Sequence, residues 1–198
     1  MSGGNDDQQL IEACRSGRTE AFGGLIRRYQ DRLYPTALRL TGRPEDALDL
    51  LQDAFLRAFQ KLDRFHGDSS FYTWIYRIMV NLALSERRKR RKPGRSEVSL
   101  VPDLADTSER SDPADALNRS ERDFQVQNAL NALAPDHRAV VVMKEFDGLR
   151  YEEIASMLDV PVGTVRSRLH RARCELRDRL RDLILDDQSA PRGPGEIP

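Results

Sequence analysis

The sequence contains few of the residues that build metal sites, disulfide frameworks or catalytic centres. Its 198 residues include two cysteines, and Cys14 and Cys174 lie far apart without a Cys-x-x-Cys pair. We therefore expect reduced thiols, no metal site and no cofactor. His66, His137 and His170 do not cluster, and no paired carboxylates accompany them at catalytic spacing. An enzyme such as a helical nuclease is therefore not expected.

Long apolar runs and strand-type alternation are also scarce. No apolar run approaches the length of a membrane span, and residues 1–9 are polar and acidic, unlike a signal peptide. We expect a cytoplasmic protein without membrane insertion. Helical periodicity dominates both ends of the chain, which predicts an all-α fold.

Net charge is absent as well, since 32 basic residues balance 32 acidic ones. The charges are nevertheless segregated along the chain. Residues 87–95 carry seven basic side chains and no acid, and residues 162–181 carry seven arginines against two acids. Residues 96–123 carry eight acids against three bases. Because local fields govern docking, zero net charge does not exclude binding to nucleic acid.

The helical pattern divides into two small domains. Three prolines, several Ser and Asp, and few large apolar residues predict a flexible acidic linker between them. The Pro/Gly-rich C-terminal end predicts a disordered tail. The predicted units are an N-terminal domain 1–92, a linker 93–120, a C-terminal domain 121–185 and a tail 186–198. The predicted helices span 7–16, 19–41, 45–62, 71–90, 121–133, 136–146, 151–158 and 162–184.

Residues 152–173 are typical of a helix-turn-helix that reads the major groove of a DNA duplex. Two crossing helices would bury an apolar skeleton of Ile154, Ala155, Leu158, Val160, Val165 and Leu169. The opposite arc of the second helix is polar and basic, and arginine there can pair with guanine. We call it the reading arc: Thr164, Arg166, Ser167, Arg168, His170 and Arg171. The alternative is a helical hairpin whose arginines are only solvated.

The predicted helix 71–90 combines aromatic side chains with a basic end. Its core face comprises Phe71, Trp74, Ile75, Ile78, Met79 and Leu82. Outside that face, Tyr72, Tyr76 and Asn81 could stack on or hydrogen-bond an unpaired base, while Arg87, Arg88, Arg90 and Arg91 follow the phosphates. This predicts binding to single-stranded nucleic acid. Packing for Trp74, and a solvated helix end for the basic block, are the alternatives.

The predicted helix 45–62 has two contrasting faces. The spacing of its apolar residues predicts a buried stripe of Ala47, Leu48, Leu51, Ala54, Phe55, Ala58, Phe59 and Leu62. The opposite side carries what we call the polar stripe: Asp49, Gln52, Asp53, Arg57 and Gln60. By itself, an exposed polar stripe indicates only a solvated surface.

These segments together resemble the bacterial sigma factors of the extracytoplasmic-function class. The stretch 63–78 with Asn81 resembles that family's promoter-melting region, 45–55 its polymerase-clamp helix, and 147–169 its upstream-element reader. The resemblance covers residues 7–92 and 121–183 in the family's order. One departure is Arg150, where the family usually has a capping Ser or Thr, which contributes about 0.5–2 kcal/mol.

The resemblance implies core RNA polymerase, duplex and single-stranded promoter DNA, and an anti-sigma protein as partners. It implies that Gln52, Asp53 and Arg57 meet the polymerase clamp, and that the reading arc recognises the minus-thirty-five element. A pocket for a flipped base of the minus-ten element would comprise Phe65, Gly67, Asp68, Ser69 and Asn81.

Two other classes of protein fit parts of the sequence. A helix-turn-helix activator or repressor explains residues 136–183 but leaves the aromatic–basic helix and the loop 63–70 without a role. An interaction scaffold fits the mixed charge but not the reading arc. The interpretation that covers both ends is a factor that opens promoters without covalent chemistry.

Overall fold

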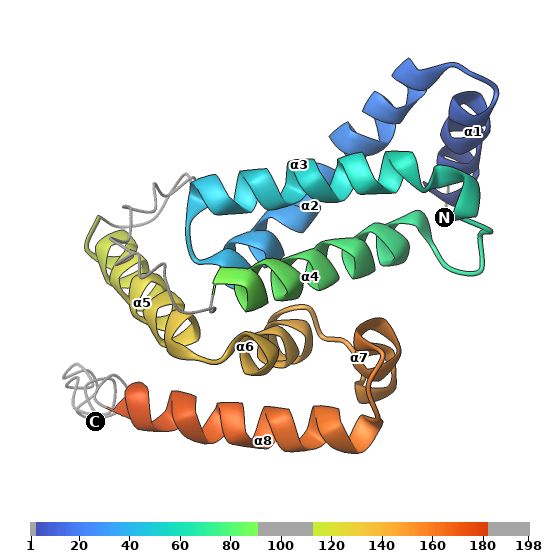
Figure 1. Ribbon diagram of the computed structural model, residues 1–198. Helices are drawn as coiled ribbons and strands as arrows, with labels where there is room; N and C mark the ends of the chain where they lie inside the picture. Colours follow the sequence, from blue (N-terminus) through green and yellow to red (C-terminus); the bar gives the residue numbers. More distant parts are fainter. Residues whose placement is uncertain (1–2, 91–112, 182–198) are drawn as a thin grey trace, which may run out of the picture.

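The computed structural model describes residues 3–90 and 113–181, and every regular element in those ranges is a helix. Figure 1 shows two helical domains, so the all-α, two-domain prediction is confirmed. Most of the predicted linker and the whole predicted tail lie outside the described residues. Within the described residues, none of the helices has the length and hydropathy needed to cross a membrane.

The N-terminal domain is built from four helices with short 3-10 turns at Thr19–Ala21 and Leu62–Arg64. Its helices are α1 (Gly3–Arg15), α2 (Phe22–Thr41), α3 (Pro44–Gln60) and α4 (Phe71–Arg90). Local chemistry explains their boundaries. Gly42 ends α2 with a left-handed φ of 86°, and Pro44 occupies the first turn of α3. The Ser70 hydroxyl accepts the Thr73 N–H at 3.1 Å, which caps the start of α4.

The core of this domain lies between α2, α3 and α4. Each helix contributes side chains at the spacing of one buried face. They include Leu25, Leu33, Ala47, Leu50, Ala54, Ile75 and Met79, each at most 1% exposed. Two members of the predicted α3 stripe are not buried. Leu48 is 58% and Phe59 38% exposed, because both lie beside a groove that no other part of the described chain fills.

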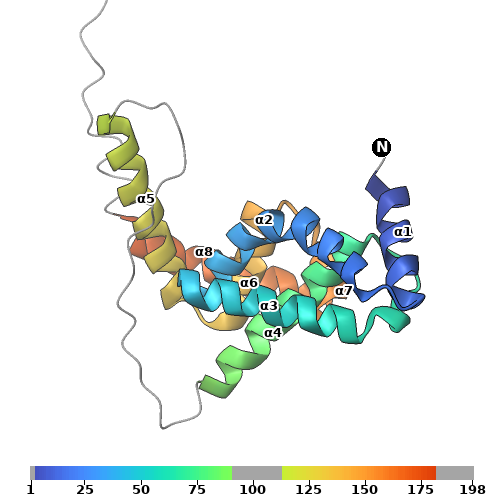
Figure 2. The ribbon, with the colours of Figure 1, turned by 90° about the horizontal axis from the view of Figure 1, so that it is seen from above.

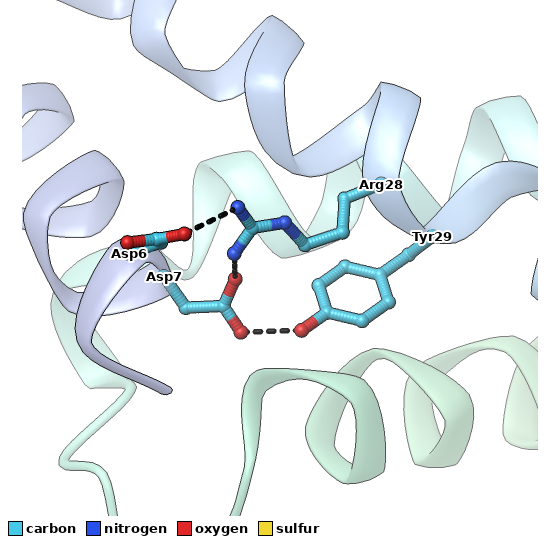
Figure 3. Close-up of polar contacts among 4 residues, drawn as sticks. All are labelled: Asp6, Asp7, Arg28 and Tyr29. Carbon is cyan, nitrogen blue, oxygen red and sulfur yellow. Dashed lines mark hydrogen bonds and ion pairs between the residues drawn. The ribbon is translucent and has the colours of Figure 1, made fainter. Parts of the chain in front are cut away.

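A polar cluster fastens α1 to α2 (Figure 3). The Arg28 guanidinium pairs with Asp7 at 2.5 Å and with Asp6 at 3.2 Å, and the Tyr29 hydroxyl donates to the other oxygen of Asp7. Burial, reinforced by this hydrogen bond, raises the pKa of Tyr29 to about 12. The hydrogen bond from this hydroxyl helps to hold the first helix against α2.

The C-terminal domain departs from the predicted helices at three places. Its elements are α5 (Pro113–Ala132), α6 (Pro135–Val141), a π-helical turn η3 (Val142–Phe146), α7 (Tyr151–Leu158) and α8 (Val162–Arg179). Helix α5 begins inside the predicted linker, because Pro113 suits a first turn and good helix formers follow it. The predicted helix 136–146 is interrupted by the π-turn. Helix α8 ends at Arg179, short of residue 184.

The helix-turn-helix itself matches its prediction. Ile154, Val165 and Leu169 are at most 2% exposed where α7 crosses α8, whereas Leu158 and Val160 are half-buried. Asp159 turns the chain with a left-handed φ of 54°. At the start of α7, the Glu153 carboxylate accepts the Arg150 N–H at 2.7 Å. This half of a capping box partly compensates for the missing Ser or Thr.

The two domains are packed on one another. Helix α6 lies between α4 and α8 (Figure 1). One cluster of buried apolar side chains runs through both domains. Seen from above, α1 and α5 lie at opposite ends of the molecule (Figure 2). Because α6 separates α8 from α4, the reading helix α8 lies on the side of the C-terminal domain that faces away from α4 (Figure 1).

Candidate nucleic-acid interface and docking groove

The reading arc is accessible on the outer side of α8. Arg166, Ser167, His170 and Arg171 are exposed, and Thr164 and Arg168 are half-buried. Arg168 differs from its neighbours because its guanidinium is paired with Asp136 of α6 at 2.9 Å. Arg168 therefore joins the reading helix to the rest of its domain. The four exposed residues are free to enter the major groove of a DNA duplex.

Several contacts that the sequence does not indicate hold α8 against the rest of its domain. The Tyr151 ring lies 5.8 Å from the Arg166 guanidinium and 5.1 Å from the Lys144 ammonium, within the range of cation–π attraction. Arg173 donates two hydrogen bonds to one oxygen of Glu145, at 2.6 and 3.0 Å. These pairs join α8 to the π-turn and to α7, and no periodicity in the sequence predicts them.

The aromatic residues of α4 fall into two groups. Trp74 packs against Phe65 with ring centroids 5.1 Å apart, which supports the packing alternative for this tryptophan. Tyr72 is half-buried under the Arg32 guanidinium, 3.8 Å from its ring centroid. The spacing of α4 predicts that Tyr76 lies outside the core face, but the residue is only 2% exposed. It is covered by the C-terminal domain, which the local pattern of α4 could not indicate.

Asn81 of α4 also contacts the C-terminal domain. Its amide donates to the Arg77 carbonyl at 3.0 Å and to the Met157 carbonyl of α7 at 3.3 Å. The residue remains exposed. Arg87, Arg88 and Arg90 continue along the same helix, while Arg91 lies outside the described residues.

The loop 63–70 separates into a buried anchor and an exposed tip. Phe65 is 7% exposed and packs on Phe71 and Trp74, so its ring belongs to the core in this structure. Gly67, Asp68 and Ser69 are exposed, and Gly67 has a left-handed φ of 83°. Arg15 of α1 donates to the Leu62 and Phe65 carbonyls and so fixes the base of the loop.

All five residues of the polar stripe are exposed on α3. Beside them on the same helix lie three exposed apolar residues, Leu48, Leu56 and Phe59, of which Leu56 is 52% exposed. The three apolar residues and Gln52 of the polar stripe line a groove of about 580 Å³ between α2 and α3, whose α2 wall includes Ile26 and Tyr34. An apolar groove with a polar rim is typical of a surface that receives another protein element.

Comparison with known proteins identifies both domains. Residues 25–92 match the family model for Sigma-70 region 2, and residues 123–176 match that for Sigma-70, region 4. The chain is 37% identical over 185 residues to the RNA polymerase sigma-H factor of Pseudomonas aeruginosa, covering 90% of this chain and 95% of that relative. It is 38% identical over 184 residues to the ECF RNA polymerase sigma-E factor of Escherichia coli K12, covering 90% and 96% of the two chains.

The fold is similar to that of a solved sigma factor. The sigma factor RpoE from Bartonella quintana, crystallised in complex with the anti-sigma factor NepR, superposes with a TM-score of 0.63. The identity is 27%, over 81% of this chain and 96% of that one. The chain therefore belongs to the sigma factors of the extracytoplasmic-function class, which are transcription-initiation factors and not enzymes. In keeping with that class, it associates with core RNA polymerase and binds promoter DNA.

Proposed function

We propose that this sigma factor recognises the minus-thirty-five element with the reading arc of α8 and the minus-ten element with α4 and the loop 63–70, and that it promotes opening of the duplex. The observation that carries the proposal is the exposure of Arg166, Ser167, His170 and Arg171 on the outward side of the second helix of a helix-turn-helix. Arginine in that position can pair with guanine in the major groove.

Opening would depend on capture of an unpaired base. Polar and aromatic groups for that base come from the exposed tip of the loop 63–70 and from Tyr72 and Asn81, which follow it in sequence on α4. Extrusion costs a few kcal/mol, which stacking and phosphate contacts from the basic end of α4 offset. Tyr76 would join this surface only after the covering domain moves away.

Docking on core RNA polymerase is assigned to the polar stripe and the adjoining groove on α3. The apolar residues Leu48, Leu56 and Phe59 supply buried area, and the stripe supplies polar contacts. An anti-sigma partner is supported by the solved relative that was crystallised with one. We also propose the functional division into 1–92, a linker 93–120, 121–185 and a tail 186–198. Association with polymerase implies action in the bacterial cytoplasm.

The test is transcription by purified core polymerase on a promoter library, with and without this chain. Enriched promoters should share two elements, and permanganate should detect unpaired thymines near the downstream one. A transcription activator or repressor of the helix-turn-helix type would instead bind duplex DNA tightly without polymerase. Selective duplex binding by the chain alone, with no polymerase-dependent transcripts, would favour that second candidate.

A further inference from the structure

The last residue of α1 is bonded to the beginning of the loop 63–70. One nitrogen of the Arg15 guanidinium donates to the Leu62 carbonyl at 2.9 Å and to the Phe65 carbonyl. These carbonyls lie at the start and just past the end of the 3-10 turn Leu62–Arg64, which leads from α3 into the loop. Hydrogen bonds from an ionised donor are stronger than those from a neutral one. Arg15 therefore fixes the backbone where the loop leaves the core.

Phe65, the residue that precedes the exposed tip of the loop, is held from two sides. Its ring packs on the rings of Phe71 and Trp74, with centroids 5.9 and 5.1 Å away. Its carbonyl is held by Arg15. A packed ring fixes the position of the residue, whereas a bonded carbonyl fixes the orientation of the planar peptide unit that follows. The direction in which the chain continues towards the tip therefore depends on Arg15.

The other end of the loop is fixed by the cap of α4. The Ser70 hydroxyl accepts the Thr73 N–H at 3.1 Å, and the Ser70 carbonyl accepts the Trp74 N–H at 3.1 Å. Residues 66–69 lie between this cap and Phe65, and all of them are exposed. Fixing both ends of so short a segment restricts the backbone conformations that it can adopt. The shape of the tip therefore follows from its two anchors.

Helix α1 holds Arg15 in a defined position. Ile11 and Cys14 are 1% and 8% exposed, so both side chains belong to the core. Nearer the start of the helix, Asp7 is paired with Arg28 of α2 (Figure 3). Because α1 is packed and bonded along its length, the Arg15 guanidinium reaches the loop from a fixed direction.

We propose that Arg15 is a positioning residue for recognition of the minus-ten element. It holds the loop 63–70 in the shape that prefers one unpaired base over the others. This rests on the proposed function of that loop. Arg15 lies outside residues 25–92, so the match to the family model for Sigma-70 region 2 assigns it no role.

The proposal predicts a loss of preference and not a uniform loss of binding. When only a fraction of molecules has the competent shape, apparent affinity falls by that fraction. The loss is largest for the base that fits the ordered pocket best. A loosened loop therefore recognises the four bases more equally.

The experiment compares the full-length chain with Arg15→Ala, Arg15→Lys and the matched control Arg18→Ala. Arg18 is an exposed arginine three residues further along the chain, so its replacement removes the same charge. Lysine keeps the charge and can still donate to carbonyls. Since Arg15 is itself exposed, the alanine variant should keep the fold, which urea unfolding followed by circular dichroism checks.

Two measurements are made on each protein. With core polymerase, opening is measured on a promoter selected in the transcription assay and on three versions that differ at one non-template base of the minus-ten element. Permanganate reactivity of downstream thymines shared by all four promoters gives the amount of open complex. In the free chain, acrylamide quenching of the single tryptophan, Trp74, measures the order of the loop base, because its ring contacts Phe65.

Arg15→Ala should lower opening on the selected promoter roughly fivefold, because hydrogen bonds from a charged donor no longer hold the competent shape. Opening on the other three promoters should change much less, and Trp74 should be quenched more readily. Arg15→Lys should restore most of the preference. Arg18→Ala should match the wild type in both measurements.

Two kinds of failure can be told apart. An equal loss on all four promoters would make Arg15 a phosphate contact and overturn its positioning role. An unchanged preference, or unchanged quenching of Trp74, would overturn it as well, because the loop would then be ordered without Arg15. If the wild-type chain opened all four versions equally at every minus-ten position tried, the proposed function of the loop itself would fail.

Discussion

Arg168 and Asp136 form an ion pair of 2.9 Å that joins α8 to the first turn of α6. Their side chains are 22% and 29% exposed, so water screens the pair only partly. Asp136→Ala should lower the free energy of unfolding by about 1 kcal/mol, at the upper end for a pair near the surface. Urea denaturation measures this change. Asp178→Ala, on the exposed side of α8, should stay within about 0.5 kcal/mol of the wild type.

Arg171 and Arg179 lie on the same helix but should differ in their effect on DNA. Arg171 is exposed within the reading arc, whereas Arg179 is the last residue of α8 and lies beyond the reach of the groove. Arg171→Ala should lose about 1–3 kcal/mol of discrimination at one upstream base pair. Arg179→Ala should lose none. Binding measured on matched and mismatched elements decides the point, and equal losses on both would make Arg171 a phosphate contact.

Asp53→Arg should abolish polymerase docking without unfolding the protein. Asp53 is an exposed residue of the polar stripe, so charge reversal there costs little stability. Co-purification with core polymerase should drop to background while the helical content stays unchanged. Asp178→Arg makes the same reversal far from α3 and should co-purify normally. Retention of Asp53→Arg by core enzyme at wild-type levels would refute the assignment of this stripe.

Asn81→Ala should separate promoter binding from promoter opening. The residue has no place in duplex reading, since it lies on α4 and not on α8. We expect closed complexes to form normally and permanganate reactivity of unpaired thymines to fall. A promoter with a pre-melted bubble should rescue the variant at least partly, because unpairing accounts for a few kcal/mol of the barrier. If the variant lost both duplex binding and promoter opening, and the pre-melted bubble did not restore activity, Asn81 would have a structural role.

The Tyr29–Asp7 contact predicts a loss of stability in alkali. The pKa of Tyr29 is raised to about 12, mainly by burial, whereas the pKa of tyrosine in an unfolded chain is about 10. The stabilisation is complete below pH 10 and is lost as the pH rises towards 12, because the unfolded state releases its proton first. The free energy of unfolding of the wild type should therefore fall more steeply over this range than that of Tyr29→Phe. Parallel pH profiles would show that Tyr29 is not the group responsible.

Local signals in the sequence were sufficient for much of the fold. Helices α4 and α7 occupy the predicted ranges, because Ser70 caps one and the Asp159–Pro161 turn ends the other. The reading arc is also accessible where its spacing predicts it, since one polar side of a long helix needs no distant partner to remain in water.

The sequence-based predictions of burial were wrong where a residue is covered by a distant segment of the chain, or where no segment covers it. Tyr76 is buried by residues some seventy positions later in the chain, which the periodicity of α4 cannot register. Leu48 and Phe59 fit a buried pattern by spacing, but the described chain offers no element to cover them. The π-turn leaves the apolar pattern of 136–146 intact and changes only the backbone, so composition carries no trace of it.

The groove on α3 has a consequence for the behaviour of the unbound protein. Its apolar side chains are exposed on a chain whose formal net charge is zero and whose isoelectric point is about 6.9. Near neutral pH, little electrostatic repulsion keeps two such surfaces apart, so the free chain is prone to associate with itself. A partner seated in the groove would cover these side chains and so raise the solubility of the chain. The concentration of soluble protein would then depend on the concentration of its partners as well as on its own rate of synthesis.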